Sequence, residues 1–267
     1  MSDRVNFDIK DNIAEVRLNR AEKHNALDHK MFEAIIRIGD QIAHDDSIRA
    51  VILHGAGESF CAGIDLSMFA GEGMASDFLK RMKRREGSLA NYYQSAAYIW
   101  REIPVPVIAV LQGAVYGGGL QIALGADIRY AAEDIKLSIM EIKWGIIPDM
   151  ALTTSLPYLM SVDKAIELAV TADILNASEA LDKGLITAIK GRPLKQARVL
   201  AKGIANRSPD AIRSIKRLFY ETWHKNDEVS LALEAKLQMQ VMAGENQMEA
   251  VKSSLSKTKP NFSNSKL

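Results

Sequence analysis

The amino-acid sequence predicts an α/β fold whose C-terminal third is helical. Residues 50–53 and 107–111 are continuously apolar, which indicates strands buried on both faces, as in a parallel sheet covered by helices. After Pro148 apolar residues recur mainly with helical periodicity. The chain has 267 residues, which is long enough for one large domain with a sizeable hydrophobic core.

The first elements read as a β-hairpin, because apolar and polar residues alternate in 5–9 and in 13–18 on either side of a Lys-Asp-Asn segment. Asp28 is expected to cap a helix that extends to about Ala43. The remaining expected elements are a helical region over 76–101, a helix over 117–124, strands over 128–131, 136–139 and 185–189, and helices over 151–160, 162–171, 178–183, 194–206, 209–224 and 228–242.

The composition argues against several classes of protein. Lys plus Arg number 34 and Asp plus Glu 33, so the net charge of +1 argues against nucleic-acid binding or docking on an anionic membrane as the main task. The single cysteine, Cys61, cannot form an internal disulfide or a Cys-rich zinc site, and the five histidines lack metal-ligand spacing. We therefore expect no metal site and a reducing, cytoplasmic location.

Three segments bear on targeting. Residues 103–126 form the longest uncharged run, but two prolines and five glycines interrupt it, so we expect a strand, a turn and a helix rather than a membrane span. The first residues contain no apolar leader. The sequence ends in Ser265, Lys266 and Leu267, which reads as a peroxisomal address if the source is eukaryotic and as a polar tail otherwise.

Two glycine-containing turns are candidates for ligand binding. Residues 117–119 are three successive glycines between a strand and a helix, and residues 60–65 form a second turn after a buried strand. The first N–H groups of a helix lack intrahelical acceptors and can bind a phosphate or hold a developing oxyanion. Tight packing alone would also explain either set of glycines. No complete dinucleotide fingerprint and no Gly-x-Ser-x-Gly elbow accompanies them.

Two carboxylates, Glu141 and Asp149, lie in the mostly apolar segment 139–150. Apolar surroundings raise the pKa of a carboxyl group, which suits general acid–base catalysis. The alternative is that each carboxylate caps a helix or pairs with a surface cation. The basic run 80–85 is a solvated helix face or a contact for an anionic ligand.

The motifs together resemble the crotonase superfamily, the enoyl-CoA hydratase and isomerase family. The resemblance covers nearly the whole chain. It rests on residues 23–27, 60–66, 108–119 and 126–131, on Glu141 followed by Gly145 and Pro148, and on residues 177–185. Several motifs in the right order are more specific than any one of them.

The resemblance implies a crotonase-like spiral of ββα units with a helical C-terminal trimerisation region. Residues 1–200 would be the core that binds and transforms acyl-CoA, and 201–267 the assembly region of a homotrimer or homohexamer. The backbone N–H groups of Ile64 and Gly118 would hold the thioester oxygen, and coenzyme A would enter as part of the substrate, with no separate cofactor. Substrate-binding roles are implied for Lys23, His24, Ala26, Ala62, Asp65, Gln121 and Lys257.

The resemblance leaves several reactions open. Family hydratases use two glutamates, and the first position is Gln121 here while the second is Glu141. Dienoyl-CoA isomerases carry acidic residues at the positions of Gln121, Glu141 and Asp149, so we favour a double-bond shift in an unsaturated acyl-CoA of fatty-acid metabolism, with Glu141 and Asp149 as the catalytic pair. The alternatives are hydration of a 2-enoyl-CoA with a water held by Gln121, an aroyl-CoA dehalogenase with Asp149 as nucleophile, and an RNA-binding or non-catalytic homologue.

Overall fold

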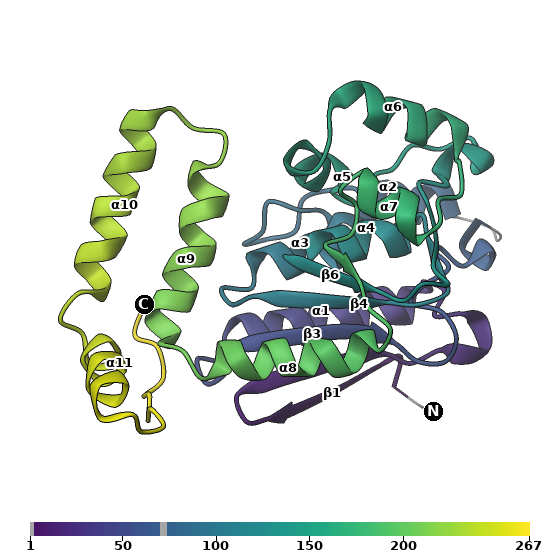
Figure 1. The fold of residues 1–267 in the computed structure, drawn as a ribbon. Helices are drawn as coiled ribbons and strands as arrows, with labels where there is room; N and C mark the ends of the chain where they lie inside the picture. The colour runs from purple at the N-terminus through teal and green to yellow at the C-terminus, as the bar shows by residue number, and fades with distance from the viewer. Residues whose placement is uncertain (1–2, 70–73) are drawn as a thin grey trace.

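A sheet with the strand order β1-β2-β3-β4-β6-β8 forms the centre of the computed structural model, which describes residues 3–69 and 74–267 (Figure 1). Its strands are β1 (Val5–Lys10), β2 (Ile13–Leu18), β3 (Ala50–Gly55), β4 (Val107–Leu111), β6 (Ile128–Ala131) and β8 (Ala188–Ile189). The β1–β2 hairpin is antiparallel, and the later pairings are parallel. The predicted hairpin and buried strands are confirmed. A short strand that the sequence pattern does not predict, β5 (Ala114–Tyr116), pairs with β7 (Lys136–Ser138).

Helices cover the sheet and continue beyond it. They are α1 (His29–Ala43), α2 (Met74–Arg81), α3 (Tyr92–Glu102), α4 (Gly118–Gly125), α5 (Leu152–Ser155), α6 (Val162–Thr171), α7 (Ala177–Asp182), α8 (Pro193–Ala205), α9 (Pro209–Thr222), α10 (Asp227–Val241) and α11 (Glu245–Ser256), with short 3₁₀ segments η1 (Ala21–Lys23), η2 (Leu66–Phe69), η3 (Glu141–Trp144) and η4 (Leu156–Tyr158). Asp28 caps α1 as predicted, because its carboxylate accepts from the N–H of Met31 at 2.8 Å.

Further elements differ from the sequence prediction, among them the helix expected over 151–160, which is α5 followed by η4. The helical region expected over 76–101 is two helices, because Asn91 and Gln94 form a capping box that begins α3. The strand expected over 185–189 pairs only at β8. The helix α11 is not predicted, because its sequence is mostly polar and the apolar side chains that it carries remain exposed in the chain.

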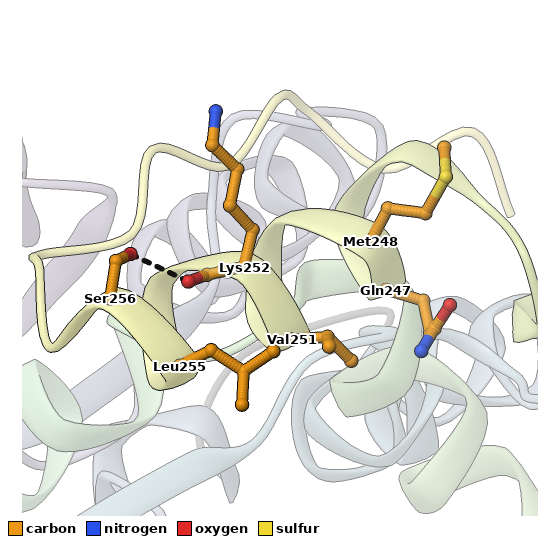
Figure 2. Close-up of a pocket in the computed structure, with 6 residues that line it drawn as sticks. All are labelled: Gln247, Met248, Val251, Lys252, Leu255 and Ser256. Carbon is orange, nitrogen blue, oxygen red and sulfur yellow. Dashed lines mark hydrogen bonds between the residues drawn. The ribbon is translucent and has the colours of Figure 1, made fainter.

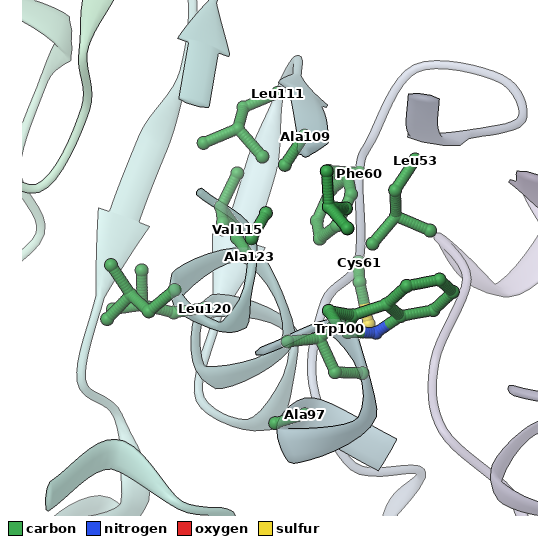
Figure 3. Packing of buried hydrophobic residues seen from close by; sticks show 14 of the residues in the cluster. Leu53, Phe60, Cys61, Ala97, Trp100, Ala109, Leu111, Val115, Leu120 and Ala123 are labelled. Atoms are coloured by element: carbon green, nitrogen blue, oxygen red, sulfur yellow. The ribbon is translucent and has the colours of Figure 1, made fainter. Parts of the chain in front are cut away.

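The core lies on both faces of the sheet. Val51 and Leu53 of β3 pack with α1, α3 and α4, whereas the alternate residues Ala50 and Ile52 pack with α8. Figure 3 shows part of the first of these layers, in which Trp100 of α3 and Cys61 are both fully buried. Burial on both faces explains the continuous apolarity of β3 and β4. This packing fixes the end of β3, which the turn of residues 60–65 follows, and the end of β4, from which β5 leads to the glycines 117–119.

The helices α9 and α10 form an arm that stands away from the α/β core, with α11 beside its base (Figure 1). Lys216 fastens α9 to the core, because its Nζ donates to the carbonyl oxygens of Trp100 and Val105 and pairs with Asp127 at 2.8 Å. The predicted boundary at residue 200 falls inside α8, which packs on the sheet along its length. The final residues fold back on α9, where the hydroxyl of Ser265 donates to Asp210 at 2.6 Å. Within 3–69 and 74–267, no helix has the length and apolarity to cross a bilayer.

Candidate active site

The turn after β3 directs the N–H group of Ile64 into a cavity. Gly63 has φ +91°, a backbone conformation that L side chains rarely adopt, and its carbonyl accepts from Leu27 N at 2.8 Å. Asp65 N in turn donates to Leu27 O at 3.0 Å. Because the neighbours of Ile64 make these bonds on one side of the turn, the N–H of Ile64 itself points to the opposite side.

The second donor comes from the start of α4. Gly118 is the first residue of this helix, so its N–H has no intrahelical acceptor. Gly117 before it has φ +50° and ψ −121°, which only glycine adopts readily. The two turns are joined directly, since Tyr116 N donates to Cys61 O at 3.0 Å. Ile64 and Gly118 both line one cavity of about 380 Å³, which brings the two predicted donors together.

Asn25 holds the first turn in place. Its side chain is fully buried, and Nδ2 donates to the carbonyl oxygens of Ala56 at 2.9 Å and Ser59 at 2.8 Å. Its Oδ1 accepts from Arg20 N at 2.8 Å. In the sequence Asn25 stands out only as part of the motif 23–27. A buried, positive-φ asparagine with all these partners is a structural anchor for the site.

Glu141 brings a buried carboxylate to the same cavity. It begins η3, is 6% exposed, and its Oε1 accepts from Gln121 Nε2 at 2.6 Å. Its Oε2 is also buried and has no hydrogen-bond partner among the described residues. Burial raises the pKa of Glu141, and the nearby charge of Asp149 raises it further, while the Gln121 hydrogen bond acts in the opposite direction. Glu141 lines the cavity, and because its Oε2 has no hydrogen-bond partner among the described residues, this oxygen keeps its capacity to accept a proton.

Asp149 lies between two cavities. It lines the cavity of Ile64 and Gly118, and it also lines an adjoining cavity of about 1070 Å³. The larger cavity has mainly apolar walls, which include Met68, Phe78 and Ile147. Burial raises the pKa of the Asp149 carboxyl group. The site therefore offers two desolvated carboxyl groups, of which Asp149 alone borders both cavities.

Most of the predicted substrate-binding residues lie at this cavity. Lys23, Ala26, Ala62 and Asp65 line it. The carboxylate of Asp65 also pairs with Arg20 at 2.6 Å, and hydrogen bonds from Ser67, followed in strength by the contacts with Arg20, lower its pKa to about 2. This pairing gives Asp65 a structural task at the turn.

Three predicted residues lie elsewhere. His24 is exposed, and its Nδ1 lies 3.1 Å from Ser59 Oγ rather than at the cavity wall. Gln121 is buried behind Glu141 and does not line the cavity. Lys257 is the C-cap of α11, beside the arm, whereas the described cavity-lining residues come from the first 150 positions. In the basic run 80–85, Arg81 pairs with Asp77 at 2.7 Å.

The lining residues that are not predicted from the sequence include Tyr116, Trp144, Ile146 and Met150. Tyr116 precedes the predicted glycines on β5, and the other three flank the predicted carboxylates. The one feature of the sequence that could have indicated these residues is that they lie close in the chain to predicted site residues. From the sequence, an apolar side chain in a loop could belong to the core or to the surface, and only the fold shows that it lies beside a cavity.

Comparison with known proteins agrees with this geometry. The sequence model of the family described as "Enoyl-CoA hydratase/isomerase" matches residues 8–265. A Bacillus subtilis protein described as "Probable enoyl-CoA hydratase" is 35% identical over 243 residues, with 89% of this chain and 90% of that protein covered. Mouse mitochondrial Δ(3,5)-Δ(2,4)-dienoyl-CoA isomerase is 32% identical over 252 residues (92% and 77% covered).

Solved structures show the same fold. The crystal structure of an enoyl-CoA hydratase from Bacillus anthracis superposes with a TM-score of 0.86 at 28% identity, covering 97% of this chain and 98% of the other. The fold predicted from the sequence, a crotonase-like α/β fold with a helical C-terminal region, is thereby confirmed. The family match, the relatives and the paired turns lead to one conclusion: the chain is an enzyme of the enoyl-CoA hydratase/isomerase family, within the crotonase superfamily.

Proposed function

We propose that the protein shifts the double bonds of a 3,5-dienoyl-CoA to give the conjugated 2,4-dienoyl-CoA. The observation that carries this proposal is the position of Asp149 at the junction of the two cavities, with Glu141 on the smaller one. The thioester oxygen lies between the N–H groups of Ile64 and Gly118. These donors stabilise the dienolate that forms when the carbon next to the carbonyl loses a proton.

The two carboxyl groups have separate tasks in this reaction. Glu141, which lies against Gly117 beside one oxyanion donor, takes the proton from C2 on its free Oε2. The electron pair moves through the diene, and Asp149, which borders the apolar cavity for the acyl chain, gives its proton to C6. Glu141 then carries a proton and Asp149 carries none, and exchange with solvent restores both. The raised pKa of Asp149 favours the protonated form that this step needs.

The contacts of Gln121 give hydration less support. A water activated for attack on a 2-enoyl-CoA needs a group that holds it beside Glu141. Gln121 is 3% exposed, its Nε2 is engaged with Glu141, and its Oε1 accepts from Met150 N at 2.9 Å. Both polar atoms of the amide are therefore in use within the protein.

Parallel assays with a 3,5-dienoyl-CoA and with crotonyl-CoA test the reaction. We expect a change in ultraviolet absorbance from the first substrate, because the diene becomes conjugated with the thioester, and in D₂O we expect deuterium at C6 of the product. Glu141→Gln and Asp149→Asn should each lower kcat by roughly 10²–10⁴-fold. Glu133→Gln, a matched change at an exposed site, should leave kcat unaltered. Activity confined to hydration of crotonyl-CoA would refute the isomerase proposal.

We further propose that the chain works as a homotrimer, alone or as a pair of trimers. Large apolar side chains are exposed on the arm, on α11 and on α6, among other surfaces: Ile215, Phe219, Trp223, Leu231, Met239, Leu255, Val162, Ile166 and Val170. Figure 2 shows Val251 and Leu255 on one side of α11, beside a surface hollow. Exposed apolar surface of this kind marks interfaces, and contact between different faces of successive copies closes a ring. Lys257 would then reach a neighbouring cavity.

Sedimentation velocity tests the assembly. Leu255→Glu places a charge on this surface and should shift the protein toward smaller species, because an unpaired carboxylate is costly to bury. Gln41→Glu, which adds the same charge at an exposed position of α1, is the control and should leave the mass unchanged. A wild-type protein that sediments as a monomer at micromolar concentration would refute the proposal.

A further inference from the structure

Gln121 connects three segments of the site with one side chain. It belongs to α4, the helix whose first N–H is the Gly118 donor. Its Nε2 donates to Glu141 Oε1 at 2.6 Å, and its Oε1 accepts from Met150 N at 2.9 Å. Met150 directly follows Asp149. A single buried amide thus joins the oxyanion donor, the base and the segment that carries the acid.

The contact with Met150 fixes the orientation of the amide. A backbone N–H can only donate, so the atom of Gln121 that faces it must be the oxygen. The NH₂ group therefore faces Glu141, and Oε1 of Glu141 can only accept. The remaining oxygen, Oε2, is buried and without a partner among the described residues.

The structure assigns Gln121 as a positioning residue, an inference that rests on the isomerase function proposed above. Gln121 confines proton exchange at Glu141 to Oε2, and it keeps that oxygen aligned with the segment that carries Asp149. An N–H donor also favours the ionised form of the carboxylate, which is the form that removes the C2 proton. Among the described residues, Asp149 is the other carboxyl group that acts on Glu141. Gln121 does not need to touch the substrate to do this.

The first test compares pH profiles of kcat/KM for the wild type, Gln121→Met and Gln112→Met. Loss of the Gln121 donor should move the acid limb, the fall of kcat/KM at low pH, to higher pH. It should also lower kcat by roughly 10–10²-fold, with a smaller change in KM, because a hydrogen bond to a charged group is lost. Gln112 donates to Gly55 O at 2.8 Å and does not touch Glu141. Gln112→Met therefore removes an amide hydrogen bond and should leave the limb in place.

The second test needs no activity, so it remains valid if the protein proves not to be an isomerase. Gln121→Glu places a second buried carboxyl group against Glu141, and its melting temperature should fall relative to wild type as the pH rises through the carboxyl range. The exchanged pair, Gln121→Glu with Glu141→Gln, restores an amide facing a carboxylate and should recover a wild-type pH dependence. An unshifted acid limb in Gln121→Met, or a Gln121→Glu protein whose melting temperature follows pH as wild type does, overturns the inference.

Discussion

Gly119→Ala tests whether the spacing of the two oxyanion donors sets the rate. A Cβ at Gly119 would lie 2.4 Å from Cys61 O, 2.8 Å from Cys61 Cβ and 2.9 Å from its Sγ. Real Cβ atoms keep at least 3.0 Å from such neighbours, so α4 and the turn of Cys61 must separate by about 0.6 Å, the difference between 3.0 and 2.4 Å. Gly118 sits on one of these segments and Ile64 on the other, so the gap between their N–H groups changes with it.

The expected loss follows from that displacement. Misplacing reacting groups by about 1 Å costs roughly 10²-fold in rate, and losing one oxyanion donor costs roughly 10²–10³-fold. We therefore expect kcat on a 3,5-dienoyl-CoA to fall by about 10²-fold. KM should change much less, because the donors act mainly on charge that develops in the transition state.

The matched control is Gly203→Ala in α8, where an added Cβ meets nothing within 4 Å. Alanine is favoured over glycine in a helix by roughly 1 kcal/mol, so this variant should be at least as stable as wild type and equally active. Gly119→Ala must retain a cooperative melting transition for the comparison to count. A folded Gly119→Ala protein with wild-type kcat would refute the proposed dependence on donor spacing.

Two further predictions concern stability. Burial raises the pKa of Glu141, so its contribution to stability is present below the unfolded pKa and is lost as pH rises through the folded pKa. The difference in melting temperature between Glu141→Gln and wild type should therefore become more positive between about pH 4 and 8. A difference that does not change with pH would contradict this. Lys216→Met leaves Asp127 and two carbonyl oxygens without their cation and should cost about 3–5 kcal/mol in urea unfolding. Lys266→Met, which breaks an exposed ion pair with Glu245, should cost less than about 1 kcal/mol, and equal losses would refute the distinction.

The sequence predicts most of this fold because its periodicities follow burial. The continuous apolarity of β3 and β4 reports packing on both faces, and Asp28 caps α1 as its position suggests. The pattern misses α11 because the apolar side chains of that helix face outward in the isolated chain. It also misses β5, whose three residues are too few to show a period. Short or exposed elements carry no burial signal of their own.

The candidate site is predicted unevenly for a similar reason. The turns of Gly63 and Gly117 and the carboxylates Glu141 and Asp149 are recognisable by residue type, and the fold brings them to one cavity. The role of Asn25 could not be read from its neighbours in the chain, since its partners lie about thirty residues away at Ala56 and Ser59. Long-range hydrogen bonds leave no local pattern.

Residue 121 illustrates why the reaction cannot be chosen from residue types. A glutamine there could hold a water for hydration or brace a carboxylate for proton transfer, and the sequence is the same in both cases. In the fold the amide donates to Glu141 and accepts from Met150 N, so it braces the carboxylate and the segment that follows Asp149. Releasing either group to bind water would leave a buried polar atom unpaired, at a cost of about 1–3 kcal/mol. The contacts that the fold gives to Gln121, rather than its identity, therefore support the proton transfer proposed above.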